Sequence, residues 1–472
     1  MIKREKYLNE LIDSMNYKMP KVITGIRRCG KSFLLKEIFF EYLVNEKKVS
    51  AENIMIIELD DINNIQYRNP IKLSNYIREK IKNEQTYYVF IDEVQLVTSI
   101  INPEFTNGET VIAKEGDKNI ISFVDVVLGI SRIKNVDLYV TGSNSKLLSK
   151  DVVTEFRDKA INIHLQPLSF EEFYSYYGGD QYAAFYEYLV HGGMPMAVLE
   201  HDLARKENYL KGLFNTTYLR DIIEHNKFRK VETLDELCDV LSFATGQILN
   251  TQKLANIIES RKKEKIDKST IDKYLNAFID AYIVEEVNRY DIKGNSAIGA
   301  LRKYYFSDTG LRNARLDFTS LDLGQLIETV VYNELIYHGY NVMVGSFNQF
   351  EKNKNNESVV KKYEVDFYAT KGIESVYIQV AENIDDAQTK QREIRPFHLI
   401  RDANKKIVLI NRPIKAMKLE NGIILYGIVD FIMNLKWHPP PLIEDGGFPL
   451  KKSYDFSING LLWCDLLSMF FY

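Results

Sequence analysis

Eight residues near the amino terminus constrain this chain more than any other feature of its sequence. Gly25-Ile26-Arg27-Arg28-Cys29-Gly30-Lys31-Ser32 has the form G-x-x-x-x-G-K-[ST], between a β-branched run at 21–24 and an amphipathic run at 33–42. Glycines let such a loop curl so that its backbone N–H groups face a polyphosphate, and the helix after the loop presents its positive end. The sequence therefore predicts a strand, a phosphate-binding loop and a helix in that order.

The loop pattern also assigns chemistry to single residues. Lys31 is expected to contact the β and γ phosphates of ATP, and Ser32 to give its hydroxyl to Mg²⁺. Arg27 and Arg28 could add positive charge. The residues predicted to surround the nucleotide are Gly25, Ile26, Arg27, Arg28, Cys29, Gly30, Lys31, Ser32 and Phe33.

Short apolar runs alternate with helical patterns over the first 175 or so residues, which is typical of a parallel sheet with crossover helices. The expected strands are 21–24, 53–59, 87–91 and 136–141, each nearly all apolar, as for strands covered on both faces. Residues 97–117 break this pattern and predict an insertion or a surface loop.

Two acidic residues follow the third of these strands. In an open α/β sheet, ligands bind at the carboxyl ends of the strands. Asp92 is therefore expected to hold Mg²⁺, directly or through water, and Glu93 to orient or polarise the attacking water. The structural alternative is an ordinary polar strand end in a turn.

Polar residues also follow the fourth strand, in Thr141-Gly142-Ser143-Asn144-Ser145. Asn144 is a candidate for holding the nucleophilic water near the γ-phosphate, although a capped strand-to-helix turn would use the same residues. Arg157 could act as an arginine finger, within the subunit or across to a neighbour. A solvated surface arginine is the alternative.

The segments GIRRCGKS, FIDE, TGSNS and LQPLSFEEF together resemble the AAA+ ATPases of bacteria and archaea whose carboxyl-terminal half is a domain of unknown function. The resemblance runs from about Met1 to Asn434 and leaves the physiological substrate open. It implies an ATP site formed by Lys31, Ser32, Asp92, Glu93 and Asn144.

Residues 182–315 predict a helical unit that ends in a winged helix, a module that the resemblance includes here. Asn250 precedes one helical run, and Ser269 opens a second in a pattern like a capping box. The basic linker 261–265 and the short polar residues suit contacts to DNA phosphates, whereas a packing or protein-binding unit is the alternative. On the second helix the residues expected to face away from the core are Thr270, Lys273, Asn276 and Ala277.

The third unit has Glu328 on a helix, Asp366 on a strand and Gln379 on the next strand, an order that resembles the PD-(D/E)xK nuclease core. In that core, acidic groups hold Mg²⁺ and a lysine stabilises the attacked phosphate. Because the final D/E-x-K is Gln379-Val380-Ala381, we expect a degenerate fold that grips nucleic acid or protein and cuts nothing. A lysine such as Lys361, Lys362 or Lys390 could substitute. Residues 346–362, rich in Asn, Lys and Glu, predict a mobile loop.

Charge and cysteine content limit the binding partners and the cellular location that the sequence predicts. Lys plus Arg is 61 and Asp plus Glu is 65, a net charge of −4, so contact with nucleic acid would need a local basic patch. Cys29, Cys238 and Cys464 are too far apart for a disulfide framework or a CxxC zinc pair. With no signal-peptide pattern and no long apolar run, a cytoplasmic location without a membrane partner is expected.

The expected fold class is α/β: a P-loop AAA+ core with a parallel sheet, then a helical and winged-helix domain, then an α/β restriction-endonuclease-like domain. The expected boundaries are 1–178, 182–315 and 320–434, with a tail of unknown role at 435–472. The expected function is a Mg²⁺-dependent ATPase that moves DNA- or protein-binding carboxyl-terminal domains, potentially as a homo-oligomer. The alternatives are a nucleotide-gated DNA-binding regulator with negligible turnover and, less favoured, an active nuclease.

Overall fold

The structure is a computed structural model that describes residues 2–435 except 115, 143–158, 229, 264, 353–355 and 420–421. Within the described residues, no helix combines the length and the apolar character that crossing a membrane requires.

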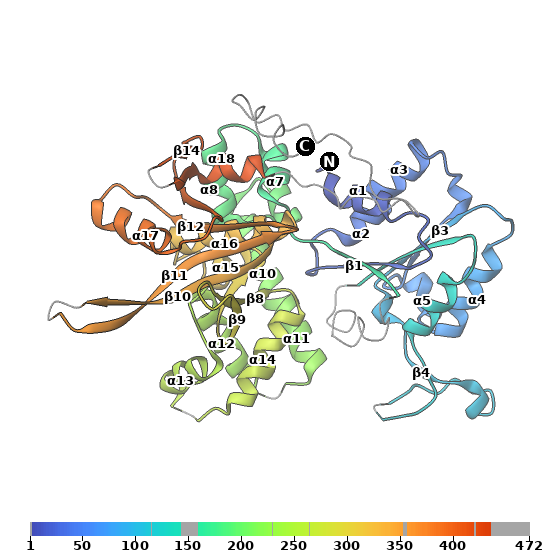
Figure 1. Ribbon diagram of the computed structural model, residues 1–472. Helices are drawn as coiled ribbons and strands as arrows, with labels where there is room; N and C mark the ends of the chain where they lie inside the picture. Colours follow the sequence, from blue (N-terminus) through green and yellow to red (C-terminus); the bar gives the residue numbers. More distant parts are fainter. Residues whose placement is uncertain are drawn as a thin grey trace, which may run out of the picture. The chain divides into compact units, whose positions relative to one another are not determined.

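A five-stranded parallel sheet forms the centre of the amino-terminal region (Figure 1). The four expected strands are confirmed. A fifth, short edge strand was missed because only one of its four residues is buried. In sheet order the strands are β2 (Ile54–Glu58), β3 (Tyr87–Asp92), β6 (Val136–Thr141), β1 (Lys21–Thr24) and β7 (Ile161–His164).

Helices cover both faces of this sheet, so successive strand residues are buried in different clusters. Ile23 and Phe90 pack with α1 (Glu5–Asp13) and with the helix after the loop. Val22 and Val89 pack with α4 (Pro70–Lys80) and α5 (Phe123–Ser131). The helix after the loop runs through α2 (Lys31–Phe33), the π-helical η1 (Leu34–Phe39) and α3 (Phe40–Asn45).

Residues 97–117, expected as an insertion or a surface loop, are mostly irregular. They include η5 (Pro103–Phe105) and β4 (Ile100–Ile101), which pairs with β5 (Ile120–Ile121) in a small separate ribbon. Three further 3-10 turns join the sheet elements: η2 (Ala51–Asn53), η3 (Ile62–Arg68) and η4 (Val94–Leu96).

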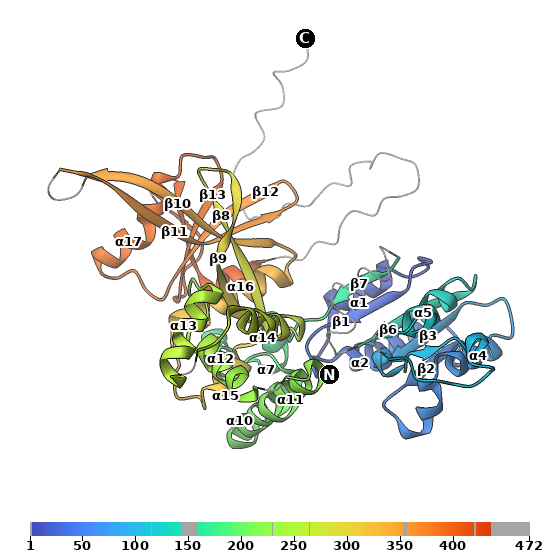
Figure 2. The same cartoon turned by 90° about the horizontal axis from the view of Figure 1, so that it is seen from below.

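A helical region comes next in the chain (Figure 2). Its helices are α7 (Phe170–Tyr177), α8 (Gln181–His191), α9 (Pro195–Leu199), α10 (Leu203–Gly212), η7 (Leu213–Tyr218), α11 (Leu219–Asn226), α12 (Val231–Phe243), α13 (Thr251–Lys262), α14 (Lys268–Asp280) and α15 (Thr309–Arg315).

Two details of the sequence-based reading of α14 are wrong. The helix starts at Lys268 because the side chain of Asp267, not Ser269, accepts a hydrogen bond at its amino end. Ala277 does not face away: it is 4% exposed and packs in the apolar core, where a small residue fits between larger ones.

The carboxyl-terminal region is built on an eight-stranded mixed sheet. Its helices are α16 (Leu323–Tyr337), α17 (Ala387–Leu399) and α18 (Ile428–Asn434). In sheet order the strands are β14 (Met417–Lys418), β15 (Ile424–Gly427), β13 (Lys405–Ile410), β12 (Glu374–Ala381), β11 (Ser358–Lys371), β10 (Asn341–Lys352), β8 (Val284–Asp291) and β9 (Ser296–Phe306).

The prediction of a mobile loop at 346–362 is wrong. β10 and β11 pair antiparallel out to Lys352 and Ser358 and project as a long two-stranded ribbon (Figure 1). The many polar residues of this segment hid the two strands from the sequence analysis. Cross-strand pairs stabilise them, such as Phe350 opposite Val360 and the stacked rings of Phe347 and Tyr363.

Candidate functional site

The loop predicted to bind phosphate joins β1 to α2 and turns sharply at three residues. Gly25, Arg28 and Gly30 have φ values of 139°, 65° and 102°. A Cβ on Gly25 would lie 2.1 Å from the Leu165 carbonyl oxygen at the end of β7, so only glycine fits there. The two glycines thus shape the tight bend that the sequence predicts.

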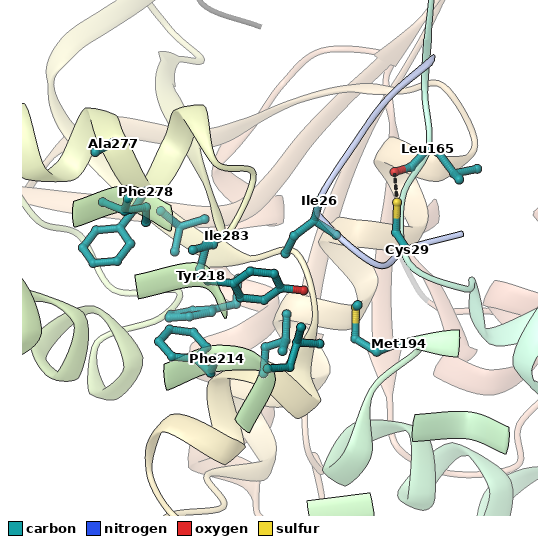
Figure 3. Close-up of a cluster of buried hydrophobic side chains, with 14 of the residues drawn as sticks. Ile26, Cys29, Leu165, Met194, Phe214, Tyr218, Ala277, Phe278 and Ile283 are labelled. Atoms are coloured by element: carbon teal, nitrogen blue, oxygen red, sulfur yellow. Dashed lines mark hydrogen bonds between the residues drawn. The ribbon is translucent and has the colours of Figure 1, made fainter. Parts of the chain in front are cut away.

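Lys31 is folded onto this loop. Its ammonium donates to the Gly25 and Ile26 carbonyl oxygens at 2.9 and 3.0 Å, and the residue is 5% exposed. Cys29 is fully buried, and its thiol lies 3.4 Å from the Leu165 carbonyl oxygen (Figure 3). Cys29 can therefore offer a ligand only its backbone. Arg27, Arg28 and Phe33 are exposed.

The strand order brings several polar side chains to one edge of the sheet. β3 lies between β2 and β6, so the carboxyl ends of these strands meet beside the loop. Ser32 donates its hydroxyl to Asp92 at 2.9 Å, and Thr141 donates to the same carboxylate oxygen. Lys36 lies 3.5 Å from the other oxygen and also pairs with Glu58. Partial burial opposes the charge on Lys36, but these two carboxylates outweigh it and raise the pKa of Lys36.

The oxygens at this edge fit a magnesium ion. A serine hydroxyl, a carboxylate, water and phosphate oxygens are the hard ligands that Mg²⁺ prefers, usually with few protein ligands. Ser32 and Asp92 already lie within hydrogen-bonding distance, so both could face one cation beside a bound phosphate.

Glu93 immediately follows β3 and has the left-handed backbone conformation, with φ 56° and ψ 47°. Its backbone N–H donates to the Thr141 hydroxyl at 3.1 Å, and Gln95 donates to its carboxylate. These two hydrogen bonds hold the Glu93 backbone and carboxylate in place. The other two catalytic candidates, Asn144 and Arg157, lie outside the described residues.

Comparisons with known proteins address this part of the chain directly. Residues 17–174 match the family described as an AAA domain. The amino-terminal region is an AAA domain. At the level of the family, it is a nucleotide-binding ATPase domain. Residues 182–322 match a second family, a domain of unknown function.

Two relatives are similar to this chain over most of its length, beyond the residues that match the AAA family. A protein from Haemophilus influenzae is 28% identical over 439 residues, 92% of this chain and 99% of its own. One from Methanocaldococcus jannaschii is 27% identical over 417 residues, 85% of this chain and 80% of its own. Both are described as uncharacterized proteins.

Solved structures show a more distant likeness. The Aeropyrum pernix ORC2 protein has a TM-score of 0.34 and 12% identity, covering 70% of this chain and 91% of its own. Cdc6p from Pyrobaculum aerophilum has a TM-score of 0.25 and 13% identity, covering 70% of this chain and 94% of its own.

Outside the AAA domain, the residues that resemble a nuclease core lie together around a buried lysine. Lys303 on β9 is 3% exposed, and its ammonium lies 2.8 Å from Glu328, 2.9 Å from Glu364 and 3.6 Å from Asp366. Burial alone would lower the pKa of Lys303, but the three carboxylates outweigh it and raise that pKa. Burial and then Glu328 raise the pKa of Asp366 to about 8, against the opposing charge of Lys303.

Gln379 completes this cluster through hydrogen bonds. Its side-chain oxygen accepts the Asp366 N–H at 3.4 Å, and its amide donates to Glu393 at 2.8 Å. A cavity of about 520 Å³ opens beside Asp366 and Gln379. Its wall includes the basic side chains of Lys361, Lys362, Arg392 and Arg395. Among the described residues, no group of three or more His, Cys, Asp or Glu side chains is arranged to hold a metal ion.

Sequence reasoning missed several members of both clusters. Thr141 and Lys36 reach Asp92, and each carried a usable signal: Thr141 ends a neighbouring strand, and Lys36 lies one helical turn after Ser32. Lys303 carried no such signal, because only the tertiary fold brings its side chain to Glu328 on α16 and to Glu364 and Asp366 on β11. Lys303, rather than Lys361, Lys362 or Lys390, pairs with Asp366.

Proposed function

We propose that the AAA domain binds Mg²⁺-ATP in the loop of residues 25–33 and hydrolyses it. Lys31 would leave the loop carbonyls to contact the β and γ phosphates, and Ser32 and Asp92 would hold Mg²⁺, which would neutralise phosphate charge. Glu93 accepts a proton from the water that attacks the γ-phosphorus, while the bond from that phosphorus to the β–γ bridging oxygen breaks and ADP leaves. Asn144 holds that water, and Arg157 stabilises the transition state within the subunit or from a neighbouring copy.

One observation carries this proposal. Ser32 lies in the loop and Asp92 ends β3, 60 residues further on, yet their side-chain oxygens lie 2.9 Å apart. A chance glycine-rich turn would not bring a hydroxyl, a carboxylate and the buried Lys31 to one edge. The site therefore has the parts that holding a triphosphate and its cation requires.

Phosphate release from the full chain tests hydrolysis. Wild type should release phosphate from ATP only with Mg²⁺, Lys31→Ala should bind no ATP, and Glu93→Gln should bind ATP while losing roughly a hundredfold or more in rate. Lys47→Ala, an exposed residue after α3, is the matched control and should keep full activity. Equal background rates in wild type and Glu93→Gln would refute hydrolysis.

We further propose that turnover moves carboxyl-terminal units that bind DNA or protein, with boundaries at 182–315 and 320–434. The winged-helix assignment is supported by an isolated antiparallel bridge between Leu249, which lies between α12 and α13, and Arg302 on β9. On α14, Lys268 and Lys273 are exposed, as phosphate contacts would need.

The second candidate is a nucleotide-gated DNA-binding protein with negligible turnover. The four basic side chains among the residues that line the cavity beside Asp366 favour it, although three acidic residues line the same cavity. It predicts DNA retention that weakens with salt, changes with ATP, and drops in Lys268→Glu with Lys273→Glu but not in Lys47→Glu. Retention that is equal in all these variants would count against DNA contact by α14.

An active nuclease is disfavoured because Gln379-Val380-Ala381 replaces the final D/E-x-K, and because Lys303 already occupies the space between the carboxylates that would hold a metal. Mg²⁺-dependent DNA cleavage by the wild type that disappears in Asp366→Ala would reverse this conclusion. The tail at 435–472 has no proposed role, and all of it except residue 435 lies outside the described residues.

A further inference from the structure

Two side chains from outside residues 17–174 contact the outer face of the phosphate loop. The Tyr218 hydroxyl, at the end of η7, donates to the Arg27 carbonyl oxygen at 2.8 Å. The Arg4 guanidinium donates to the Cys29 carbonyl oxygen at 3.3 Å. Tyr218 and Arg4 are only 3% and 5% exposed, so both bonds are shielded from water.

These bonds fix the orientation of two peptide groups of the loop. No cis peptide bond occurs in the described residues, and in a trans peptide the carbonyl and the following N–H point in opposite directions. A carbonyl held on the outside by Tyr218 therefore turns the Arg28 N–H away from Tyr218. The Arg4 contact turns the Gly30 N–H away from Arg4 in the same manner.

We infer that Arg4 and Tyr218 are positioning residues for the nucleotide, which preset loop N–H groups toward the phosphates before ATP arrives. The inference rests on the proposed ATP site. It goes further, because it makes phosphate affinity depend on residues outside 17–174. Groups that are already aimed at a ligand need no reorganisation when it binds.

Both side chains are themselves fixed. Arg4 pairs with Glu172 at 3.0 Å and donates to the Gln166 carbonyl oxygen at 2.7 Å. Glu172 forms a capping box with Ser169 at the start of α7. A freely rotating arginine could not impose a direction on a peptide group, but this one is held at several points.

Tyr218 is held by packing. Its ring meets Phe214 edge to face at 6.2 Å, and Figure 3 shows its hydroxyl directed toward the loop around Ile26 and Cys29. One turn further on, Asp221 pairs with the Arg27 side chain at 2.6 Å, so the same helical segment contacts both the backbone and the side chain of Arg27.

The clamp formed by Arg4 and Tyr218 also leads toward the carboxyl-terminal region. The Phe170 N–H, inside the α7 cap that holds Arg4, donates to Glu334 of α16 at 2.6 Å. Arg4 is thus connected to α16 by hydrogen bonds that run through Glu172 and the start of α7.

The sharpest test is Tyr218→Phe in the full chain, which removes one hydroxyl and keeps the ring. Tyr274→Phe is the matched control: Tyr274 is 4% exposed, and its hydroxyl donates to the Lys230 carbonyl oxygen at 3.2 Å. Calorimetry should show ATP and ADP binding about fivefold or more weaker in Tyr218→Phe and unchanged in Tyr274→Phe. Without nucleotide the two variants should unfold at similar temperatures, whereas the rise in unfolding temperature with ATP should shrink only in Tyr218→Phe.

Arg4→Lys gives a second measurement. Lysine keeps the charge beside Glu172 but lacks the planar fork that reaches several acceptors, so ATP affinity should fall about tenfold while the chain stays folded. If wild type and Tyr218→Phe bind ATP equally well, the inference is wrong and the proposed ATP site stands. If wild type itself binds no ATP, the proposed function fails first.

Discussion

At the scale of single residues, the shape of the phosphate loop requires glycine at position 25. Gly25 has a φ that side chains rarely adopt, and its α-carbon lies against a backbone carbonyl that cannot move without disturbing β7. Gly30 also has a positive φ, but a Cβ there would meet only a Pro195 side-chain carbon, at 4.0 Å. The two glycines of the motif therefore differ in what they tolerate.

Gly25→Ala should cost roughly 2–4 kcal/mol of folding free energy and abolish ATP binding, because clash and backbone strain act together. Gly212→Ala is the control: Gly212 lies at the end of α10 with φ −63° and with nothing near a new Cβ, so alanine there should stabilise by up to about 1 kcal/mol. Chemical unfolding and calorimetry measure both effects. Normal ATP affinity in Gly25→Ala would contradict the loop geometry.

Glu334 should make stability depend on pH. It is 2% exposed, and burial raises its pKa from 4.5 to about 8. Between these values the unfolded chain has lost this proton and the folded chain keeps it. The Glu334 contribution is therefore complete below about pH 4.5 and is lost as pH rises through 8, by at most about 1.4 kcal/mol per pH unit.

Glu334→Gln removes this titration and keeps an oxygen to accept the Phe170 N–H. We expect a flatter urea-unfolding profile between pH 5 and 9 and higher stability than wild type above pH 8. Glu41→Gln, an exposed position on α3, should change neither. A slope that persists in Glu334→Gln would assign the effect to other groups.

The sequence predicted single residues well where chemistry dictates spacing. Ser32 and Asp92 meet as expected, because a strand-end carboxylate and a loop hydroxyl are fixed by the order of the sheet. Lys303 and Arg4 could not be found in this way. Their partners lie far away in the chain, and an isolated lysine or arginine in a sequence carries no mark of burial.

At the scale of elements, caps decided where helices begin. Asn250 precedes α13 as predicted and accepts the Lys253 N–H at 2.7 Å. For α14, the cap is Asp267 rather than Ser269, and the acidic residue three positions after Ser269, Asp272, accepts a hydrogen bond from Thr251. Local patterns therefore indicated that these helices exist but erred by two residues, because several polar residues in a row can all act as caps.

Asn250→Ala should destabilise the chain by about 1 kcal/mol through loss of this cap. Lys253→Ala, exposed in the first turn of the same helix, should stay within about 0.5 kcal/mol of wild type. Urea unfolding of the pair measures the difference. Equal stabilities would mean that α13 does not depend on its cap.

At the scale of the whole molecule, one apolar core joins the AAA domain to the helical region after it. The same cluster holds Tyr7 of α1, Phe90 of β3, Phe214 of η7 and Phe278 of α14. The sequence predicted the parallel sheet but not this sharing, because hydrophobic periodicity shows that a face is buried and not which partner buries it.

Residues 17–174 expressed alone should therefore aggregate or remain loosely packed, whereas 1–435 should fold as the full chain does. Near-ultraviolet circular dichroism and limited proteolysis distinguish the outcomes. A stable, nucleotide-binding 17–174 fragment would show that both the shared core and the clamp by Arg4 and Tyr218 are dispensable.

The eight-stranded sheet also crosses the proposed boundary near residue 320, since β8 pairs with β10 in parallel from Arg289 opposite Val344 to Asp291 opposite Ser346. A hinge at that place would have to tear a ladder of main-chain bonds. The hairpin of β8 and β9 and the ribbon of β10 and β11 are thus joined in one sheet. If the proposed ATP turnover moves this region, the hairpin and the ribbon should therefore move together.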